Sequence, residues 1–560
     1  MVWRRDTLAH SIFTITLPML PAPARSFSRA ILPWLIRFFW LGLIVWVALT
    51  FRQHGISNDE YVQHTYGQML LDWYHSGFTD QDAFHYRNLH LYGGLFDIIA
   101  AALDPYIPIM IWDIRHLLSA LFGLLGFYGV SRFASLLGGQ RLALLSMWML
   151  FLTVSWSGTM FTHTKDVPFA TCMLWTLYAT ALVVRDMEKV SGRAIVLLGL
   201  SVGSALGLRV GGAFAVIYLI LLVIWRVWLD HRYTGSPVWT RLFRMVGILL
   251  PAAVLAFVFM AICWPWSVIE ADNLLEAAKS FSHFDFNMQT IANGVVYNIS
   301  DVPRTYLLQY LAVKLPEAGL LGLVGLPVMW LLCRRGLALA DMPTRMTMHT
   351  LLLGLLFPLL FVMEDKPALY NGVRHFTFLL PLLAILSAWG ILNVWQALAN
   401  NRLHGRFAYQ ALWAGIVAGL MLVTLVDIIQ LHPYEYVRLN RLAGEQKQAQ
   451  FKWEGDYWSS ALREATDQLL DMKLPVRAQP YWVGACVDTP QIEPYLDGRF
   501  SVTRNWSEAD FYLSTTNMHC HEVMKGKVII NIQRQGMSLA VVKDRRMLQG
   551  ADRAATPAKN

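Results

Sequence analysis

Residues 31–60 read ILPWLIRFFWLGLIVWVALTFRQHGISNDE and give the first indication of the fold class. The first part of this stretch is an apolar run close to the roughly 20 residues that cross a bilayer, so it predicts a membrane-spanning helix. The acidic pair Asp59-Glu60 follows shortly after this run. A second polar break, His163-Thr164-Lys165-Asp166, separates two later apolar runs. If both breaks face one side of a membrane, ionisable groups gather at a single bilayer surface.

The composition places the chain in the membrane class. Of its 560 residues 56% are hydrophobic and only 15% are charged, and the mean hydropathy is +0.41. A soluble protein of this size needs far more charge on its surface. We therefore predict an α-helical polytopic membrane protein.

Apolar segments near spanning length recur along most of the chain. We predict eleven spans, at about 31–51, 116–137, 142–161, 167–184, 194–208, 211–229, 244–264, 318–333, 347–363, 376–396 and 409–430. The long first run, rich in Trp and Phe, favours a membrane anchor over a cleaved signal peptide.

Basic residues fall in every second loop, which predicts that those loops are cytoplasmic. They are Arg4, Arg5, Arg25 and Arg29 before the first span, then Arg141, then Arg185 with Lys189 and Arg193, then Arg226 to Arg244, Arg334-Arg335, and Arg402 to Arg406. The opposite regions are then extracytoplasmic: 52–115, 162–166, 209–210, 265–317, 364–375 and the tail after Pro433. The net charge of +8 follows largely from this asymmetry, so it indicates no nucleic-acid partner.

Two kinds of segment lie outside the spans. Amphipathic patterns over 61–108, 273–281 and 306–315 predict helices in the membrane interface. After Pro433 the pattern changes to a predicted helix at 459–472 and strands at 481–486, 511–514, 527–532 and 538–543. The domains are thus a cytoplasmic segment (1–30), a transmembrane domain (31–432) and a small extracytoplasmic α/β domain (433–560).

Five cysteines are present, and three of them, Cys172, Cys263 and Cys333, fall in or beside spans. Cys486 and Cys520 both fall in the predicted outer domain, where an oxidising compartment would allow them to pair. The sequence leaves open whether they lie within bonding distance.

Several short motifs, taken in order, resemble those of the GT-C membrane glycosyltransferases of the protein O-mannosyltransferase and aminoarabinose transferase-like family (glycosyltransferase family 39-like). The resemblance covers about residues 30–430. It is carried by Asp59-Glu60 after the first span, Lys165-Asp166-Val167-Pro168-Phe169, Gly207-Leu208-Arg209, Arg374-His375-Phe376, His432 to Tyr436 and Asp456-Tyr457-Trp458.

The resemblance implies a transferase that moves a sugar, with inversion, from a polyprenyl phosphate carrier to a hydroxyl of a protein, lipid or glycan. It makes Asp59 the candidate general base, Glu60 a neighbour that orients it or binds the acceptor, and Asp166 a residue for acceptor positioning or metal contact. A leaving lipid phosphate needs cations. Arg209, Arg374, His375 and Lys165 are the candidates for this role.

Each residue has a structural alternative. The acids could cap the helices that follow them, and the arginines could be interfacial anchors. A divalent metal bound by the acids with His85, His90, His163 or His283 also stays open. Asp456-Tyr457-Trp458 could contact the acceptor, but we favour a simple connection between the outer domain and the membrane part.

Two other functions compete with the transferase. A flippase for lipid-linked sugars would need many spans and phosphate-binding cations, but transporters usually carry ionisable groups near the bilayer midplane. A GT-C ligase moving a preassembled glycan would share the same plan. The organisation suits a bacterial inner membrane, with the endoplasmic reticulum as the alternative. The sequence specifies neither the sugar nor the acceptor.

Overall fold

The computed structural model describes residues 27–282, 288–333, 341–400 and 406–548, and most of them are helical. The long helices are α1 (Phe27–Thr50), α4 (Ile111–Leu152), α6 (Asp166–Arg185), α7 (Gly192–Leu206), α8 (Ala213–Thr234), α9 (Val238–Cys263), α13 (Glu317–Cys333), α14 (Met342–Asp365), α15 (Leu380–Asn400) and α16 (Arg406–Leu431). Among the described residues, eight helical stretches are long and apolar enough to cross a membrane, or nine if the bent pair α12 (Tyr306–Lys314) and α13 is one span. The predicted class of a helical polytopic membrane protein is confirmed, but fewer described helices qualify as spans than the eleven predicted, because α4 contains two predicted spans and α7 has only 15 residues.

Helix α4 contains two of the predicted spans. Its 42 residues correspond to about 63 Å of helix, twice the roughly 30 Å hydrocarbon core. Gly138 and Gly139 depart from helical geometry, and Gly139 has φ of +68°, a backbone conformation that glycine adopts without strain. The prediction for the second of these spans was wrong at its end. The helix stops at Leu152, and the short helix α5 (Val154–Ser157) and turns follow, because Thr153 leaves the helical conformation.

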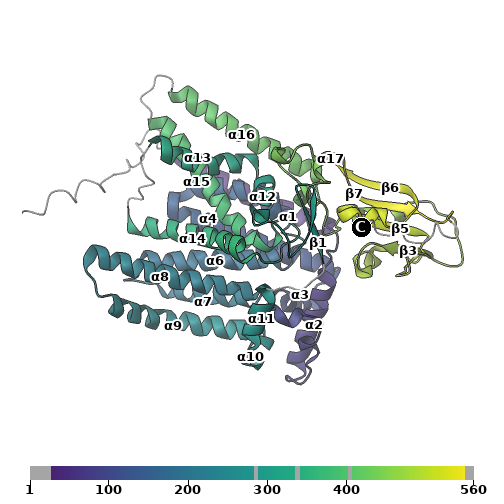
Figure 1. Cartoon of the computed structure of the whole chain (residues 1–560), viewed down its shortest axis with the longest axis horizontal. Helices are drawn as coiled ribbons and strands as arrows, with labels where there is room; N and C mark the ends of the chain where they lie inside the picture. The colour runs from purple at the N-terminus through teal and green to yellow at the C-terminus, as the bar shows by residue number, and fades with distance from the viewer. Residues whose placement is uncertain (1–26, 283–287, 334–340, 401–405, 549–560) are drawn as a thin grey trace, which may run out of the picture.

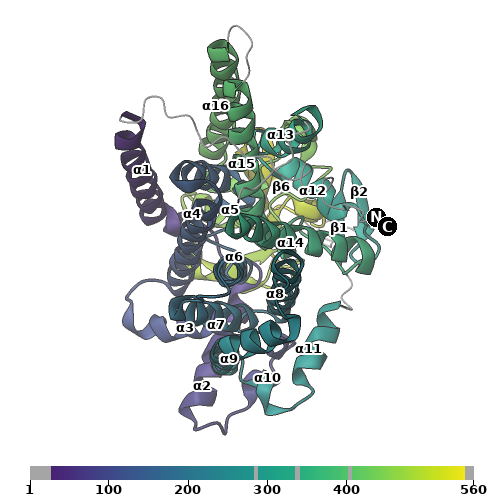
Figure 2. The same ribbon diagram turned by 90° about the vertical axis from the view of Figure 1, so that its left-hand side faces the viewer.

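Helix α6 lies at the centre of the helical part, with α4, α7, α8 and α14 around it (Figure 2). Its side chains are almost all buried, whereas α1, α9 and α16 expose most of theirs. An apolar helix that exposes apolar side chains is stable where its surroundings are lipid. The outer helices therefore face the membrane, and α6 brings its first residues into the protein interior.

Shorter elements cover the end of the bundle from which the sheet domain projects (Figure 1). They are α2 (Glu60–His75), α3 (Leu95–Leu103), α10 (Trp266–Ile269), α11 (Asn273–Ser282), α12, and the antiparallel hairpin of β1 (Gln289–Ala292) and β2 (Val295–Asn298). Helices occur in all three regions where amphipathic patterns predicted them.

The C-terminal region forms a five-stranded mixed sheet with the order β4-β3-β5-β7-β6. Its elements are α17 (Gln446–Ala449), α18 (Leu462–Leu470), β3 (Tyr481–Ala485), β4 (Phe500–Val502), β5 (Phe511–Thr515), β6 (Lys527–Arg534) and β7 (Met537–Asp544). Strand β3 pairs in parallel with β4 and β5, and β7 pairs antiparallel with β5 and β6. Helix α18 packs on β5, β6 and β7. The α/β prediction is confirmed, and β4 is an additional strand.

The sheet domain and the helical part are in close contact. The segment after α16 contributes Leu439, Ala449 and Trp453 to the main hydrophobic core of the helices. Leu431 and Tyr434, which precede Leu439, instead join the core of the sheet domain. The chain therefore crosses between the two cores more than once before the sheet begins, which fixes the domain on the end of the bundle.

Candidate functional site

Four of the predicted site residues form one chain of ion pairs. Arg374, the first residue of the 3-10 helix η6 (Arg374–Leu379), donates from Nε to Asp166 Oδ2 at 3.0 Å and from Nη2 to Asp59 Oδ2. Arg209 pairs with the remaining oxygen, Oδ1, of Asp166. The order is thus Asp59, Arg374, Asp166, Arg209, and it joins residues separated by more than 300 positions in sequence.

The two acids differ in access to solvent. Asp166 is the first residue of α6 and its side chain is 2% exposed, whereas the side chain of Asp59 is 40% exposed. Asp59 stands at the N-cap of α2, yet neither it nor the residue before α6 makes a side-chain cap hydrogen bond. Both carboxylates are instead directed at arginines. Asp166 holds the two guanidinium groups at a fixed spacing, and Asp59 is the more solvent-accessible of the two acids.

Arg209 is placed by a tight contact between two loops. It follows the end of α7, where the carbonyl of Gly207 accepts a hydrogen bond from the amide of Leu95 at 3.0 Å. A Cβ atom on Gly93 would overlap the carbonyl of Gly207, so only glycine allows this approach. The first turn of α3 therefore fixes the turn that carries Arg209.

Lys165 lies beside the ion-pair chain. Its ammonium group sits over the ring of Tyr92, 4.4 Å from the centroid. The side chain is buried, and this desolvation lowers its pKa to about 8, although Asp97 and Asp59 act in the opposite direction. His375 is half-buried and meets the ring of Tyr370 edge-on at 4.5 Å. Both residues lie near the arginines, but burial and the neighbouring arginines disfavour a charge on His375, so the prediction of His375 as a cation was wrong.

Glu60 belongs to a different cluster, although it directly follows Asp59. Its carboxylate is fully buried, accepts from the amide of Ser57 at 2.7 Å, and lies 3.2 Å from His116 Nε2 and 3.8 Å from Arg115 Nε. Arg115 also donates to Asp97 at 3.0 Å. The structure therefore separates Glu60 from the four-residue chain and places it where α2, α3 and α4 meet.

The motif Asp456-Tyr457-Trp458 reaches the site, which the sequence did not predict. The Trp458 ring stacks on Arg374, with the guanidinium carbon 4.1 Å from the centroid. Its indole Nε1 donates to His163 Nε2 at 2.6 Å, and Tyr457 Oη lies 2.9 Å from the same nitrogen. Burial lowers the pKa of His163 to about 3, so it is a neutral acceptor here. About 300 positions separate these partners, and no local pattern signals such a contact.

The residues proposed for a divalent metal do not form a ligand set. Both oxygens of Asp166 already accept from arginines, and His163 accepts from Trp458. Within residues 27–282, 288–333, 341–400 and 406–548, no group of three or more His, Cys, Asp or Glu side chains converges on a common point. His283 lies outside the described residues. These donors do not fit a metal ion.

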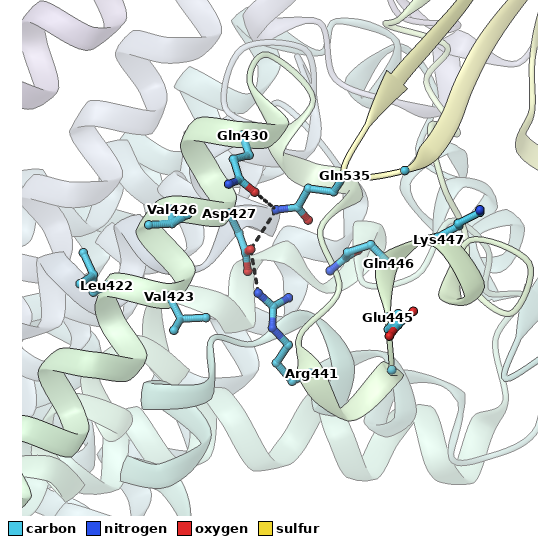
Figure 3. Close-up of a pocket in the computed structure, with 12 residues that line it drawn as sticks. Leu422, Val423, Val426, Asp427, Gln430, Arg441, Glu445, Gln446, Lys447 and Gln535 are labelled. Atoms are coloured by element: carbon cyan, nitrogen blue, oxygen red, sulfur yellow. Dashed lines mark hydrogen bonds and ion pairs between the residues drawn. The ribbon is translucent and has the colours of Figure 1, made fainter.

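A groove of about 970 Å³ lies away from the acids, between the end of α16, the 441–447 segment and the β6–β7 turn (Figure 3). Its polar groups are largely bonded to one another. Asp427 accepts from Arg441 and from Gln535, each at 2.9 Å, and Gln535 also donates to Gln430 at 2.8 Å. This region joins α16 to the sheet domain.

The sheet domain contains a disulfide bond between Cys486 and Cys520. The possibility left open by the sequence is therefore settled in favour of a bond. Cys172 and Cys263 are free and buried.

No model of a protein family matches the sequence, and no curated protein matches it. Among solved structures, the chain is similar to ArnT from Cupriavidus metallidurans bound to undecaprenyl phosphate, at 14% identity over 93% of this chain and 99% of that chain, with a TM-score of 0.45. The apo state of the same ArnT is 14% identical over 92% and 98% of the two chains, with a TM-score of 0.47. The apo oligosaccharyltransferase of Archaeoglobus fulgidus is 11% identical over 85% and 69%, with a TM-score of 0.44.

At TM-scores below 0.5 these similarities carry no argument about function, which rests on the residues of this chain.

Proposed function

We propose that this protein is an integral membrane glycosyltransferase that moves a sugar from a polyprenyl-phosphate-linked donor to an acceptor hydroxyl. The proposal rests on the ion-pair chain Asp59, Arg374, Asp166, Arg209. The partly exposed Asp59 pairs with Arg374, and the buried Asp166 holds Arg374 and Arg209 together. A base beside a phosphate-binding pair of cations is the arrangement that this transfer needs.

The acceptor hydroxyl would give its proton to the carboxylate of Asp59 while its oxygen attacks the anomeric carbon. The bond from that carbon to the phosphate oxygen breaks, and the lipid phosphate leaves with the electron pair. Attack from the face opposite the phosphate inverts the anomeric centre. No metal step is needed in this scheme, since the protein's own cations meet the phosphate.

Arg209 and Arg374 would bind the phosphate because a guanidinium matches two phosphate oxygens at once. Lys165 adds a point charge. His375 is not a further cation, because a half-buried imidazole beside Arg374 and Arg209 favours its neutral form, so it can offer the phosphate a hydrogen bond but no charge. In this account Asp166 is not the base, because both of its oxygens are engaged by arginines. Glu60 is fully buried against Arg115 and His116, so in this scheme it holds α2 on α4 and does not contact the substrates.

The placement of charge favours an enzyme over the flippase alternative. The ion-pair chain lies at helix ends, where α6 begins and α7 ends, beside the sheet domain. Transporters usually hold their ionisable groups near the bilayer midplane. The GT-C ligase alternative would use the same groups and differs in the size of the glycan moved.

Mass spectrometry of lipids that co-purify with the protein tests the donor class. The expected result is a polyprenyl phosphate sugar in the wild type, and its loss in Arg374→Ala. Arg52→Ala is the matched control, since Arg52 pairs with Asp113 at 3.7 Å outside the site. Equal retention by both variants, or absence of any polyprenyl lipid from the wild type, would reject the donor site.

A further inference from the structure

The sheet domain forms hydrogen bonds with the short connection between α1 and the acid Asp59. This connection, the 54–58 loop, is residues His54 to Asn58, and it leads directly into the N-terminus of α2. Most of the loop is buried. A segment of this kind must have its backbone polar groups satisfied by neighbours.

The neighbours come from the sheet domain. Arg463 donates to the carbonyl of His54 at 2.9 Å, and Gln491 donates to the carbonyl of Ile56, also at 2.9 Å. The amide of Ile56 donates to the Tyr495 hydroxyl at 3.2 Å. These three side chains come from α18 and the two short 3-10 helices that follow β3, at Thr489–Gln491 and Glu493–Tyr495.

Two further contacts press the loop onto the same domain. The side chain of Asn58 donates to the carbonyl of Tyr457 at 3.2 Å. A Cβ atom on Gly55 would overlap the carbonyl of Ser460. The backbone of the 54–58 loop therefore lies directly against the Tyr457–Ser460 turn.

The same turn also holds the arginine that pairs with Asp59. The Trp458 ring stacks on Arg374 at 4.1 Å, and the Trp458 carbonyl accepts from Gln491 at 3.4 Å. Gln491 is thus bonded to both the loop before Asp59 and the residue that covers Arg374. It is 2% exposed, so water does not compete for these bonds.

We infer that the C-terminal sheet domain is a positioning part of the active site, in which Gln491, Tyr495 and Arg463 set the place of Asp59 and Trp458 sets the place of Arg374. The inference rests on the proposed function for its catalytic consequence. None of these four side chains exchanges a proton or binds the sugar in this role. They hold the base and the phosphate-binding cation at the spacing that transfer requires, and small displacements of such groups are costly to the rate.

The test compares two pairs of variants of the full-length protein in detergent. Gln491→Ala combined with Tyr495→Phe releases the loop, and we expect kcat for sugar transfer to fall about 10- to 100-fold with KM for the donor nearly unchanged. Trp458→Leu removes the stack on Arg374, and we expect about 5-fold weaker binding of undecaprenyl phosphate. Trp458→Phe keeps an aromatic ring over Arg374 and should restore most of that binding.

Tyr481→Phe is the control, because the Tyr481 hydroxyl donates to the Pro475 carbonyl at 2.7 Å in the same domain without touching the loop. Hydrogen exchange of the amides in the 54–58 loop is read in the same samples. The double variant should exchange there about 5-fold faster or more, and Tyr481→Phe should not.

The inference would be overturned if the double variant had the same kcat and the same amide exchange in the 54–58 loop as Tyr481→Phe. Equal phosphate binding by Trp458→Leu and Trp458→Phe would also overturn it. If the wild type transfers no sugar, the proposed function fails, and the exchange and phosphate-binding measurements decide the positioning inference independently.

Discussion

Asp166 has two roles that depend on its burial: it sets the spacing of two arginines, and it pairs with each of them. Its two oxygens are divided between Arg209 and Arg374, so one buried carboxylate sets the spacing of two cations. Burying a guanidinium without a partner is costly, and a partner on each arginine offsets that cost. The remaining acid of the chain, Asp59, is then the accessible one, and this difference in exposure separates the proposed base from the proposed organiser.

If Lys165 binds the donor phosphate as proposed, donor binding should depend on pH. Because burial lowers its pKa to about 8, the ammonium is charged below that pH and loses its proton above it. The donor phosphodiester keeps its charge over this range, so affinity should fall as pH rises from about 7 to about 9. Titration of donor binding against pH measures this, and in Lys165→Met the fall should be absent. An unchanged profile in that variant would exclude Lys165 from the phosphate site.

The sequence predicted which residues gather here better than it predicted how they pair. Asp59, Asp166, Arg209 and Arg374 all follow from short polar breaks at predicted span ends. The sequence did not predict that Asp59 and Glu60 join different clusters. Successive residues at a helix start point in different directions, and the sequence does not say which neighbours each side chain meets. The stack of Trp458 on Arg374 depends on how the sheet domain docks, which no local pattern encodes.

At the scale of elements, a buried polar cluster ties α2 and α3 to α4. Glu60 on α2 and Asp97 on α3 both meet Arg115 on α4, and His116 adds a contact to Glu60. Removing one member leaves buried groups without partners, which costs more than losing a surface pair.

Glu60→Ala should therefore destabilise the fold more than it affects chemistry. We expect the free energy of unfolding to fall by about 3 kcal/mol, measured by denaturant titration in micelles. The folded fraction should still bind donor. Asp72→Ala, an exposed acid on the same helix, is the control and should change little. If Glu60→Ala has the stability of the wild type but has lost sugar transfer, Glu60 has a catalytic role.

The disulfide between Cys486 and Cys520 spans 34 positions and joins the end of β3 to the 3-10 turn after β5. Closing a loop of this size restricts the unfolded chain, typically by about 2–4 kcal/mol. Replacing both cysteines by serine should lower the melting temperature of the protein. Reductant should lower it in the wild type and have no further effect on the variant. If neither the serine replacements nor the reductant lowers the melting temperature, the bond adds no stability.

Element type was predictable wherever a pattern was long. The predicted spans fall on the helices of the structure, and four of the five strands of the C-terminal sheet were predicted. The errors are local: β4 has three residues, too few to show alternation, and α4 ends early at Thr153 because the chain turns toward the site. Apolar composition alone does not signal that turn.

For the whole molecule, the ion-pair chain and the sheet domain lie at one end of the helices, and the Arg226, Asp230, Arg241 and Glu188 cluster lies at the ends of α6, α8 and α9 remote from it. The positive-inside rule assigns the second end to the cytoplasm. We therefore propose that the sheet domain is extracytoplasmic.

Labelling of single added cysteines tests this orientation. Val476→Cys, at a fully exposed position of the sheet domain, should react with a membrane-impermeant thiol reagent in intact cells. Lys189→Cys should react only after the membrane is opened. Both variants are made with Cys333 replaced by alanine, and the background is then low because Cys172 and Cys263 are buried and the outer pair is bonded. The reverse pattern would invert the topology and place the site in the cytoplasm.

Asp59 is the proposed base for transfer of sugar from a lipid phosphate. The most direct measurement is mass-spectrometric detection of free polyprenyl phosphate when purified protein is given a polyprenyl phosphate sugar and cell-envelope acceptors. Wild type and the control Asp113→Asn should release it, and Asp59→Asn should be slower by about 100-fold or more while still binding the donor. Release by Asp59→Asn at the wild-type rate, or bound donor that wild type never cleaves, would contradict the account.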